Sequence, residues 1–120
     1  MPDLRTNKVS CSNYNCEFEV TLEILSGKWI ALIIWNLKNS EVIRYNEFMR
    51  LIPNITQKML TQQLKKLEKY GIVSRKVYPS VPPIVEYTLT DMGHKLIPIL
   101  ESMDEWGQFY VKNKPDTIED

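Results

Sequence analysis

Apolar side chains recur at helical spacing in the first third of the chain. Phe18, Leu22 and Leu25 fall at positions i, i+4 and i+7, which predicts one buried stripe on a helix over residues 17–25 that a Ser-Gly pair ends. A second predicted helix, residues 28–37, is apolar on most of its sides. A helix of that kind must be enclosed by other elements, so we expect it to be the central helix of the core.

The middle of the chain changes from an extended pattern to a helical one. We predict an extended piece at residues 43–45 and a helix over residues 47–52, with Asn46 as its N-cap. Thr56 is predicted to cap the next helix, which runs to about Tyr70 and is stopped by the following glycine. The Pro-Asn pair between these two helices indicates a tight turn.

Two runs rich in valine and tyrosine, residues 73–78 and 84–89, predict the strands of a hairpin. The tip between them holds three prolines, which stiffen a turn and lie where no ladder hydrogen bonds are needed. Thr90 is predicted to cap a long last helix, which Pro98 should kink or restart. A helix pair followed at once by a ribbon indicates a winged helix-turn-helix. The predicted fold class is therefore mainly α with a small β-hairpin wing (α+β).

Charge is unevenly distributed along the 120 residues, although 15 basic and 15 acidic side chains give a net charge of zero. Residues 56–89 hold six basic and two acidic side chains, a surplus of four. Residues 90–120 hold three basic and seven acidic ones, a deficit of four. The neutral total therefore hides a polarised molecule, whose basic segment can face phosphates.

The helix that follows Thr56 has an apolar stripe of three leucines and an opposite polar face. Glutamine can bond adenine with two hydrogen bonds, lysine can bond guanine, and the threonine methyl group can contact thymine. For any single lysine or glutamine, a solvated helix face explains the pattern equally well, but the order of elements favours DNA binding. The predicted DNA-binding residues on this helix and the wing are Thr56, Gln57, Lys58, Thr61, Gln62, Lys65, Arg75, Lys76, Tyr78 and Ser80.

Several blocks of the chain form a signature. They are Cys16 with Ser26-Gly-Lys-Trp29 thirteen residues later, Arg44-Tyr-Asn-Glu-Phe48, Ile55 to Leu64, Leu67 to Val73, Tyr78 to Thr90, Gly93 and Pro98. This signature resembles that of HxlR-type transcriptional regulators, a branch of the MarR-like winged-helix proteins of bacteria and archaea, over about residues 16–108. One departure is that Glu17 follows Cys16, where the family commonly has proline.

The resemblance implies a dimer whose interface is formed by the N- and C-terminal helices. The apolar surface of the helix around Trp29 and Trp35, together with Met103 and Trp106, also exceeds what three helices and a small wing would cover, which favours a homodimer independently. Two recognition helices about 34–36 Å apart would then read a pseudo-palindromic operator. The alternative is that Trp106 caps the core of a monomer. The predicted interface residues are Phe18, Leu22, Trp29, Met103 and Trp106.

Cys16 lies at the start of the first predicted helix, where the partial positive charge of the helix end favours a thiolate and Glu17 opposes it. The family resemblance implies oxidant or electrophile sensing through a cysteine in this region. Cys11 would then resolve a sulfenic acid on Cys16 or bridge to another subunit. The alternative reading has equal weight: Cys16 is a small buried apolar residue and Cys11 an incidental thiol.

The domain prediction is a flexible N-terminal arm (residues 1–15), one winged helix-turn-helix domain (16–113) with a dimerisation helix from about residue 90, and a frayed acidic tail (114–120). The polar N-terminus and an apolar run too short to span a bilayer predict a cytoplasmic protein without a membrane partner. Two cysteines and the distant His94 make a poor zinc site. We expect no metal, cofactor or enzymatic activity, because no catalytic motif is present.

The predicted function is a sequence-specific DNA-binding transcriptional regulator. It would act as a homodimer on double-stranded DNA and repress by covering a promoter, modulated by a small molecule, an oxidant or thiol chemistry. The alternative is a winged-helix interaction module that binds a protein partner through its tryptophan-rich helices and has no role at DNA.

Overall fold

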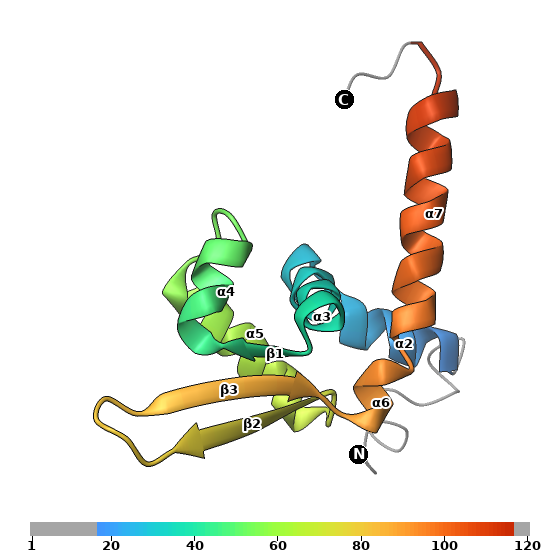
Figure 1. The fold of residues 1–120 in the computed structure, drawn as a ribbon. Coiled ribbons are helices and arrows are strands. Elements are labelled where there is room, and N and C mark those ends of the chain that lie inside the picture. The colour runs from blue at the N-terminus through green and yellow to red at the C-terminus, as the bar shows by residue number, and fades with distance from the viewer. Residues whose placement is uncertain (1–16, 117–120) are drawn as a thin grey trace.

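The computed structural model describes residues 17–116 (Figure 1). A helical body carries a β-ribbon that projects to one side, and the last helix stands out from the body on the other side. The elements in chain order are α2 (Glu17–Leu25), α3 (Lys28–Ser40), β1 (Val42–Arg44), α4 (Tyr45–Leu51), α5 (Gln57–Lys69), β2 (Val73–Tyr78), β3 (Ile84–Leu89), α6 (Asp91–His94) and α7 (Ile97–Asn113). The predicted fold class, mainly α with a β-hairpin wing, is confirmed.

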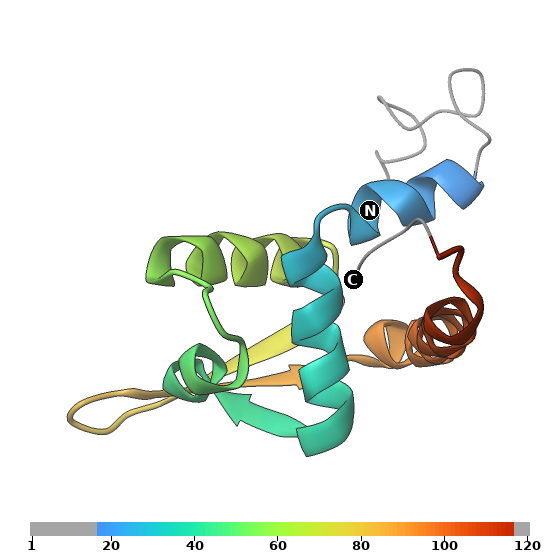
Figure 2. The same ribbon diagram turned by 90° about the horizontal axis from the view of Figure 1, so that it is seen from above.

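The core forms around α3, as the sequence predicts. Four of its side chains, Ile30, Ile33, Ile34 and Leu37, are at most 1% exposed. They contact the buried residues of α4, α5 and the sheet, and Figure 2 shows α3 running between these elements and α7. The helix continues past the predicted end to Ser40, where Glu41 adopts a left-handed φ of 67°.

The wing belongs to a sheet of three strands, in the order β1-β3-β2, with both pairings antiparallel. β1 is the extended piece predicted near residue 43, shifted by one residue, and Ile43 lies opposite Tyr87 of β3. Tyr87 is 6% exposed and meets Phe48 of α4 edge-on, with ring centroids 6.1 Å apart. β1 therefore joins the root of the wing to the helical core.

The helix caps agree with prediction at two of three positions. Thr56 accepts a hydrogen bond from the Met59 amide, and Thr90 accepts one from the Gly93 amide, each at 3.1 Å. The prediction of Asn46 as an N-cap is wrong, because α4 begins at Tyr45 and its N-cap is Arg44. Glu47 Oε1 accepts a hydrogen bond from the Arg44 amide at 2.7 Å, which favours the earlier start.

Pro98 restarts the last helix, as predicted. α6 ends at His94, and α7 begins at Ile97 with the proline in its first turn, where no amide donor is needed. Gly93 is buried in α6, and a Cβ at that position would collide with the Ile72 carbonyl oxygen. Glycine there allows α6 to approach the start of β2, which anchors α7 to the body.

Within residues 17–116, no single helix has the length and apolar character to cross a membrane. Helices α2 and α3 reach that length and apolar character only when they are taken together, and the chain bends by 85° between them. The predicted N-terminal arm (residues 1–15), which contains Cys11, lies outside the described residues, as do Cys16 and residues 117–120 of the predicted tail.

Candidate nucleic-acid interface

The polar face of α5 is exposed because the opposite face is fixed in the core. Leu60, Leu64 and Leu67 are at most 1% exposed, and burying each leucine stabilises the fold by about 1.5–3 kcal/mol. These three anchors set the rotation of the helix about its axis. The side chains left exposed on the far side are Gln57, Lys58, Gln62, Lys65 and Lys69.

Tyr45 connects α4 to this face of α5. Its hydroxyl lies 2.6 Å from Thr61 Oγ1 and also donates to the Gln57 carbonyl oxygen at 3.2 Å. Thr61 is half-buried, so this member of the predicted DNA-binding set already has a partner for its hydroxyl. Sequence periodicity gave no signal for Tyr45, because its partners lie 12 and 16 residues away.

The turn between α4 and α5 holds the two helices at a fixed angle. Ile52 and Ile55 are buried on either side of it, and Asn54 at its centre has a left-handed φ of 72°. Asparagine tolerates that conformation better than most residues. The Pro-Asn turn predicted from the sequence therefore exists, and its buried flanks make it part of the core.

The two neighbouring cations of the wing lie on opposite faces of the sheet. Arg75 is paired across the ladder with Tyr87, on the face that meets the helices, whereas Lys76 is paired with Glu86 on the other face. Burial raises the pKa of Tyr87, and a hydrogen bond from Arg75 with its positive charge opposes the rise. The sequence alone treated Arg75 and Lys76 as equivalent, but their surroundings differ.

Toward its tip the wing carries fewer available polar groups than the sequence indicated. Lys76 Nζ lies 4.9 Å from the centre of the Tyr78 ring, so these two predicted contact residues touch each other. Ser80 Oγ donates to the Pro82 carbonyl oxygen at 2.7 Å. The single proton of the Ser80 hydroxyl is therefore already used within the tip.

Arg44 and Arg50 place further positive charge beside the predicted surface. With Asn46 they line an open pocket of about 400 Å³ between α4 and the outer part of the wing, where Pro82 and Pro83 form the other wall. Arg44 Nε also lies 3.6 Å from Glu86 Oε2 of β3. These arginines were not singled out from the sequence, because neither lies on the basic helix that follows Thr56 or on the predicted hairpin.

The predicted interface residues of α2 and α7 are largely uncovered. Phe18, Leu22, Met103 and Trp106 are 52–64% exposed. Trp106 stacks on Tyr110 of the same helix, with ring centroids 5.2 Å apart, and does not cap the core. Trp29 differs from the other four because it is half-buried against the core.

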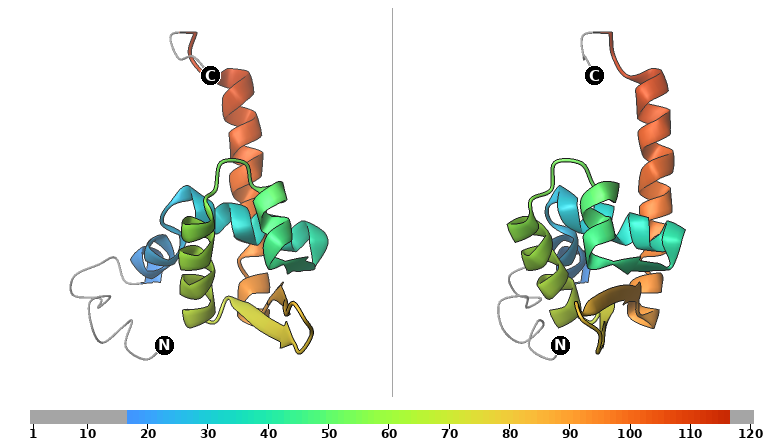
Figure 3. Two further views of the ribbon diagram at one scale, coloured as in Figure 1. Left: turned by 90° about the vertical axis from the view of Figure 1, so that its left-hand side faces the viewer. Right: turned by 60° about the vertical axis from the view of Figure 1, so that its left-hand side comes forward.

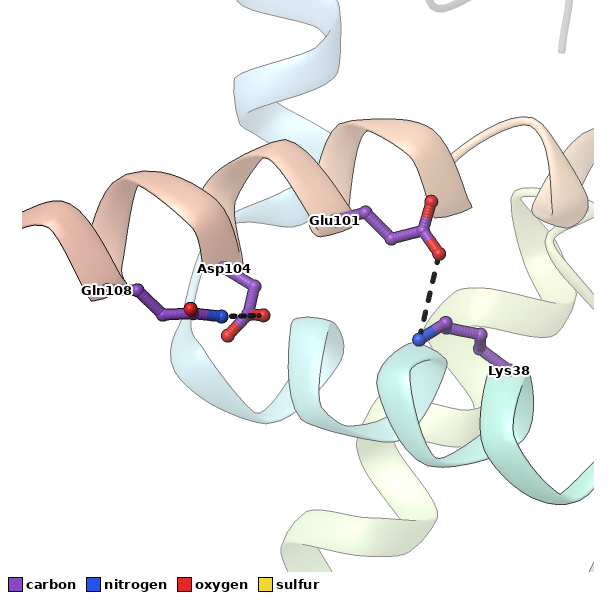
Figure 4. A network of polar contacts seen from close by, with 4 residues as sticks. All are labelled: Lys38, Glu101, Asp104 and Gln108. Carbon is purple, nitrogen blue, oxygen red and sulfur yellow. Dashed lines mark hydrogen bonds and ion pairs between the residues drawn. The ribbon is translucent and has the colours of Figure 1, made fainter.

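An ion pair holds α7 to α3 near the start of α7 (Figure 4). Lys38 Nζ lies 3.7 Å from Glu101 Oε2, and it also lies 4.1 Å from the centre of the Trp35 ring. Farther along α7, Gln108 donates to Asp104 of the same helix at 2.9 Å. In the part of the chain that the structure describes, no three His, Cys, Asp or Glu side chains are grouped to hold a metal ion.

The Tyr45–Thr61 contact predicts a measurable coupling between α4 and α5. Tyr45→Phe should lower the free energy of unfolding by about 1 kcal/mol, because a part-buried hydrogen bond is lost. Thr61→Val should have a similar effect, and the double variant should lose less than the sum. Urea unfolding of the four proteins measures this, and strictly additive losses would show that the two side chains do not interact.

Known proteins share this architecture. A family model described as HxlR-like helix-turn-helix matches residues 24–115. The transcriptional regulator YkvN of Bacillus subtilis is 48% identical over 101 residues, spanning 84% of this chain and 85% of its own. A regulator from Methanothermobacter thermautotrophicus is 44% identical over 106 residues, spanning 88% and 80%.

Solved structures agree with the sequence comparison. The redox regulator HypR in its reduced form superposes with a TM-score of 0.74 at 47% identity, over 78% of this chain and 91% of that one. The reduced form of the transcriptional regulator YodB from B. subtilis gives 0.68 at 34% identity, over 86% and 96%. The relatives are named as transcriptional regulators, which does not favour an interaction module without a role at DNA. The chain belongs to the HxlR-like helix-turn-helix family and is a transcriptional regulator with a winged-helix fold.

Proposed function

We propose that this chain binds double-stranded DNA as a homodimer, with α5 of each protomer in the major groove of one half-site. The observation that carries the proposal is the contrast between the two sides of α5. Three leucines fix one side in the core, while glutamines and lysines on the other side reach solvent. Figure 3 shows α5, α4 and the wing on one side of the molecule, with α7 behind them.

The side chains of α5 divide into two proposed roles. Gln57, Lys58 and Gln62 lie in the first two turns, where a helix entering the major groove meets base edges. Thr61 would contribute its methyl group to thymine, since its hydroxyl already faces Tyr45. Lys65 would bond phosphate, which fixes the register without reading sequence.

The exposed apolar side chains of α2 and α7 support a dimer. α7 has 17 residues, of which Leu100 is the buried one, and Ile99, Met103, Trp106 and Phe109 are 43–63% exposed. A second copy of α7 with α2 would remove these side chains from water. A two-fold axis at that position would leave both α5 helices free to contact DNA, so the operator would be a pseudo-palindrome. A dimer bound to a promoter would then repress transcription from it.

Thiol chemistry at Cys16 is proposed as the switch. The similar solved structures include HypR in an oxidized form and a diamide-treated YodB. In this chain Cys16 directly precedes α2, whose exposed Phe18 and Leu22 belong to the proposed dimer interface. Disulfide formation there would alter how two protomers meet and hence the spacing of their α5 helices.

The direct test uses a duplex selected by the wild-type protein from a random-sequence library. A Lys58→Ala/Lys65→Ala variant should bind that duplex at least roughly a hundredfold more weakly, because hydrogen bonds donated by two charged side chains are lost in each protomer. Its binding should also depend less steeply on salt. A Lys28→Ala/Lys95→Ala variant, which removes two exposed lysines outside α5 and the wing, is the matched control. Equal affinity for the two variants would contradict the proposal.

The dimer is tested by sedimentation velocity. A Met103→Glu/Trp106→Glu variant should sediment as a monomer and remain folded, because both side chains are exposed in the single chain. Met92→Glu, an exposed position on α6, should leave the dimer intact. A Met103→Glu/Trp106→Glu protein that stays dimeric would place the interface elsewhere.

The switch is tested with diamide, which accepts two electrons and two protons from a pair of thiols as they form a disulfide. Wild-type affinity for the selected duplex should change by about 5- to 150-fold, the usual range for coupled sites. Cys16→Ser should not respond, and Cys11→Ser shows whether that residue is the second thiol. No change in the wild type, or an equal response in Cys16→Ser, would remove the hypothesis.

A further inference from the structure

The tip of the wing has no charge and an apolar surface. Nine consecutive residues, 77–85, carry no ionisable acid or base other than the Tyr78 phenol. Val81 at the outermost turn is 100% exposed, and Val77 is 47% exposed. An apolar side chain in this position buries no surface against its own chain and so does not stabilise the fold.

Both hydrogen-bond donors of Ser80 bond to carbonyl groups within this tip. The Ser80 amide donates to the Tyr78 carbonyl oxygen at 2.8 Å, and the Ser80 hydroxyl donates to the Pro82 carbonyl oxygen at 2.7 Å. Prolines 79, 82 and 83 have no amide hydrogen to offer. Both donors of Ser80 are therefore used within the tip, which ends in a stiff, uncharged and largely apolar turn.

The position of the tip identifies its partner. The wing projects on the side of the molecule that carries α5, while α7 lies away from that side (Figures 1 and 3). Grooves alternate along a duplex, so a ribbon beside a helix in the major groove lies against the neighbouring minor groove.

We propose that Val81, supported by Pro82, enters the minor groove as an apolar wedge and makes the wing a reader of DNA deformability. This inference rests on the proposed DNA binding. Apolar side chains that enter the minor groove partly unstack a base step, and pyrimidine–purine steps yield most easily. The contact releases no counterions, so its contribution to affinity is independent of salt, unlike that of the lysines on α5.

The experiment compares wild type, Val81→Ala and Val81→Lys on the duplex selected by the wild-type protein. Val81→Ala should weaken binding of the dimer by roughly a hundredfold, because about two methylene equivalents leave an apolar contact in each of the two wings. The slope of log affinity against log salt should not change. Val81→Lys should steepen that slope by about 0.9 for each phosphate newly contacted. Both variants should fold normally, since Val81 touches solvent alone.

Sequence preference gives a second readout. Selection with the wild type should enrich pyrimidine–purine steps at the flanks of each half-site, and selection with Val81→Ala should lose that enrichment and keep the central bases. Met92→Ala, an exposed apolar residue on α6, is the matched control. Unchanged affinity and unchanged flanks in Val81→Ala would overturn the inference. Failure of the wild type to enrich any sequence would instead overturn the proposed DNA binding.

Discussion

The burial of three leucines on one side of α5 is the constraint on which the rest depends. Leu60, Leu64 and Leu67 are essentially inaccessible to water and lie against the buried residues of α3 and the sheet. Their burial decides which side of α5 faces outward and so turns a basic sequence segment into a surface. Without it, the lysines and glutamines would have no common direction.

Secondary contacts refine the position that the leucines set. Tyr45 reaches from α4 to Thr61 and to the backbone of the first turn of α5, and the buried Ile52 and Ile55 hold the turn between the helices. β1 joins the wing to the same core through Ile43 and Tyr87. Helix and wing therefore form one rigid unit, in which a base contact by α5 and a groove contact by the wing are made together.

Periodic features of this chain were predictable from sequence, and contacts between distant residues were not. The enclosed α3, the cap at Thr56, both wing strands and the restart at Pro98 all follow from local pattern and backbone chemistry. Asn46 is not the N-cap, because Glu47 accepts the hydrogen bond of the Arg44 amide and the helix begins earlier. The sequence alone does not show which of these two N-caps is adopted. The opposite faces of Arg75 and Lys76 and the role of Tyr45 depend on strand register and on partners far along the chain. The family could be identified from the sequence because its signature consists of short, continuous blocks of residues.

The central claim is that the exposed side of α5 reads bases near its start and holds phosphates farther along. The most direct measurement is the affinity of Gln62→Ala and Lys65→Ala for every single-base variant of the selected half-site. Gln62→Ala should lose about 1–3 kcal/mol of discrimination at one base pair, whereas Lys65→Ala should bind all duplexes more weakly by a similar factor. If both variants weaken binding uniformly, or if Gln62→Ala discriminates as the wild type does, α5 does not read the operator as described.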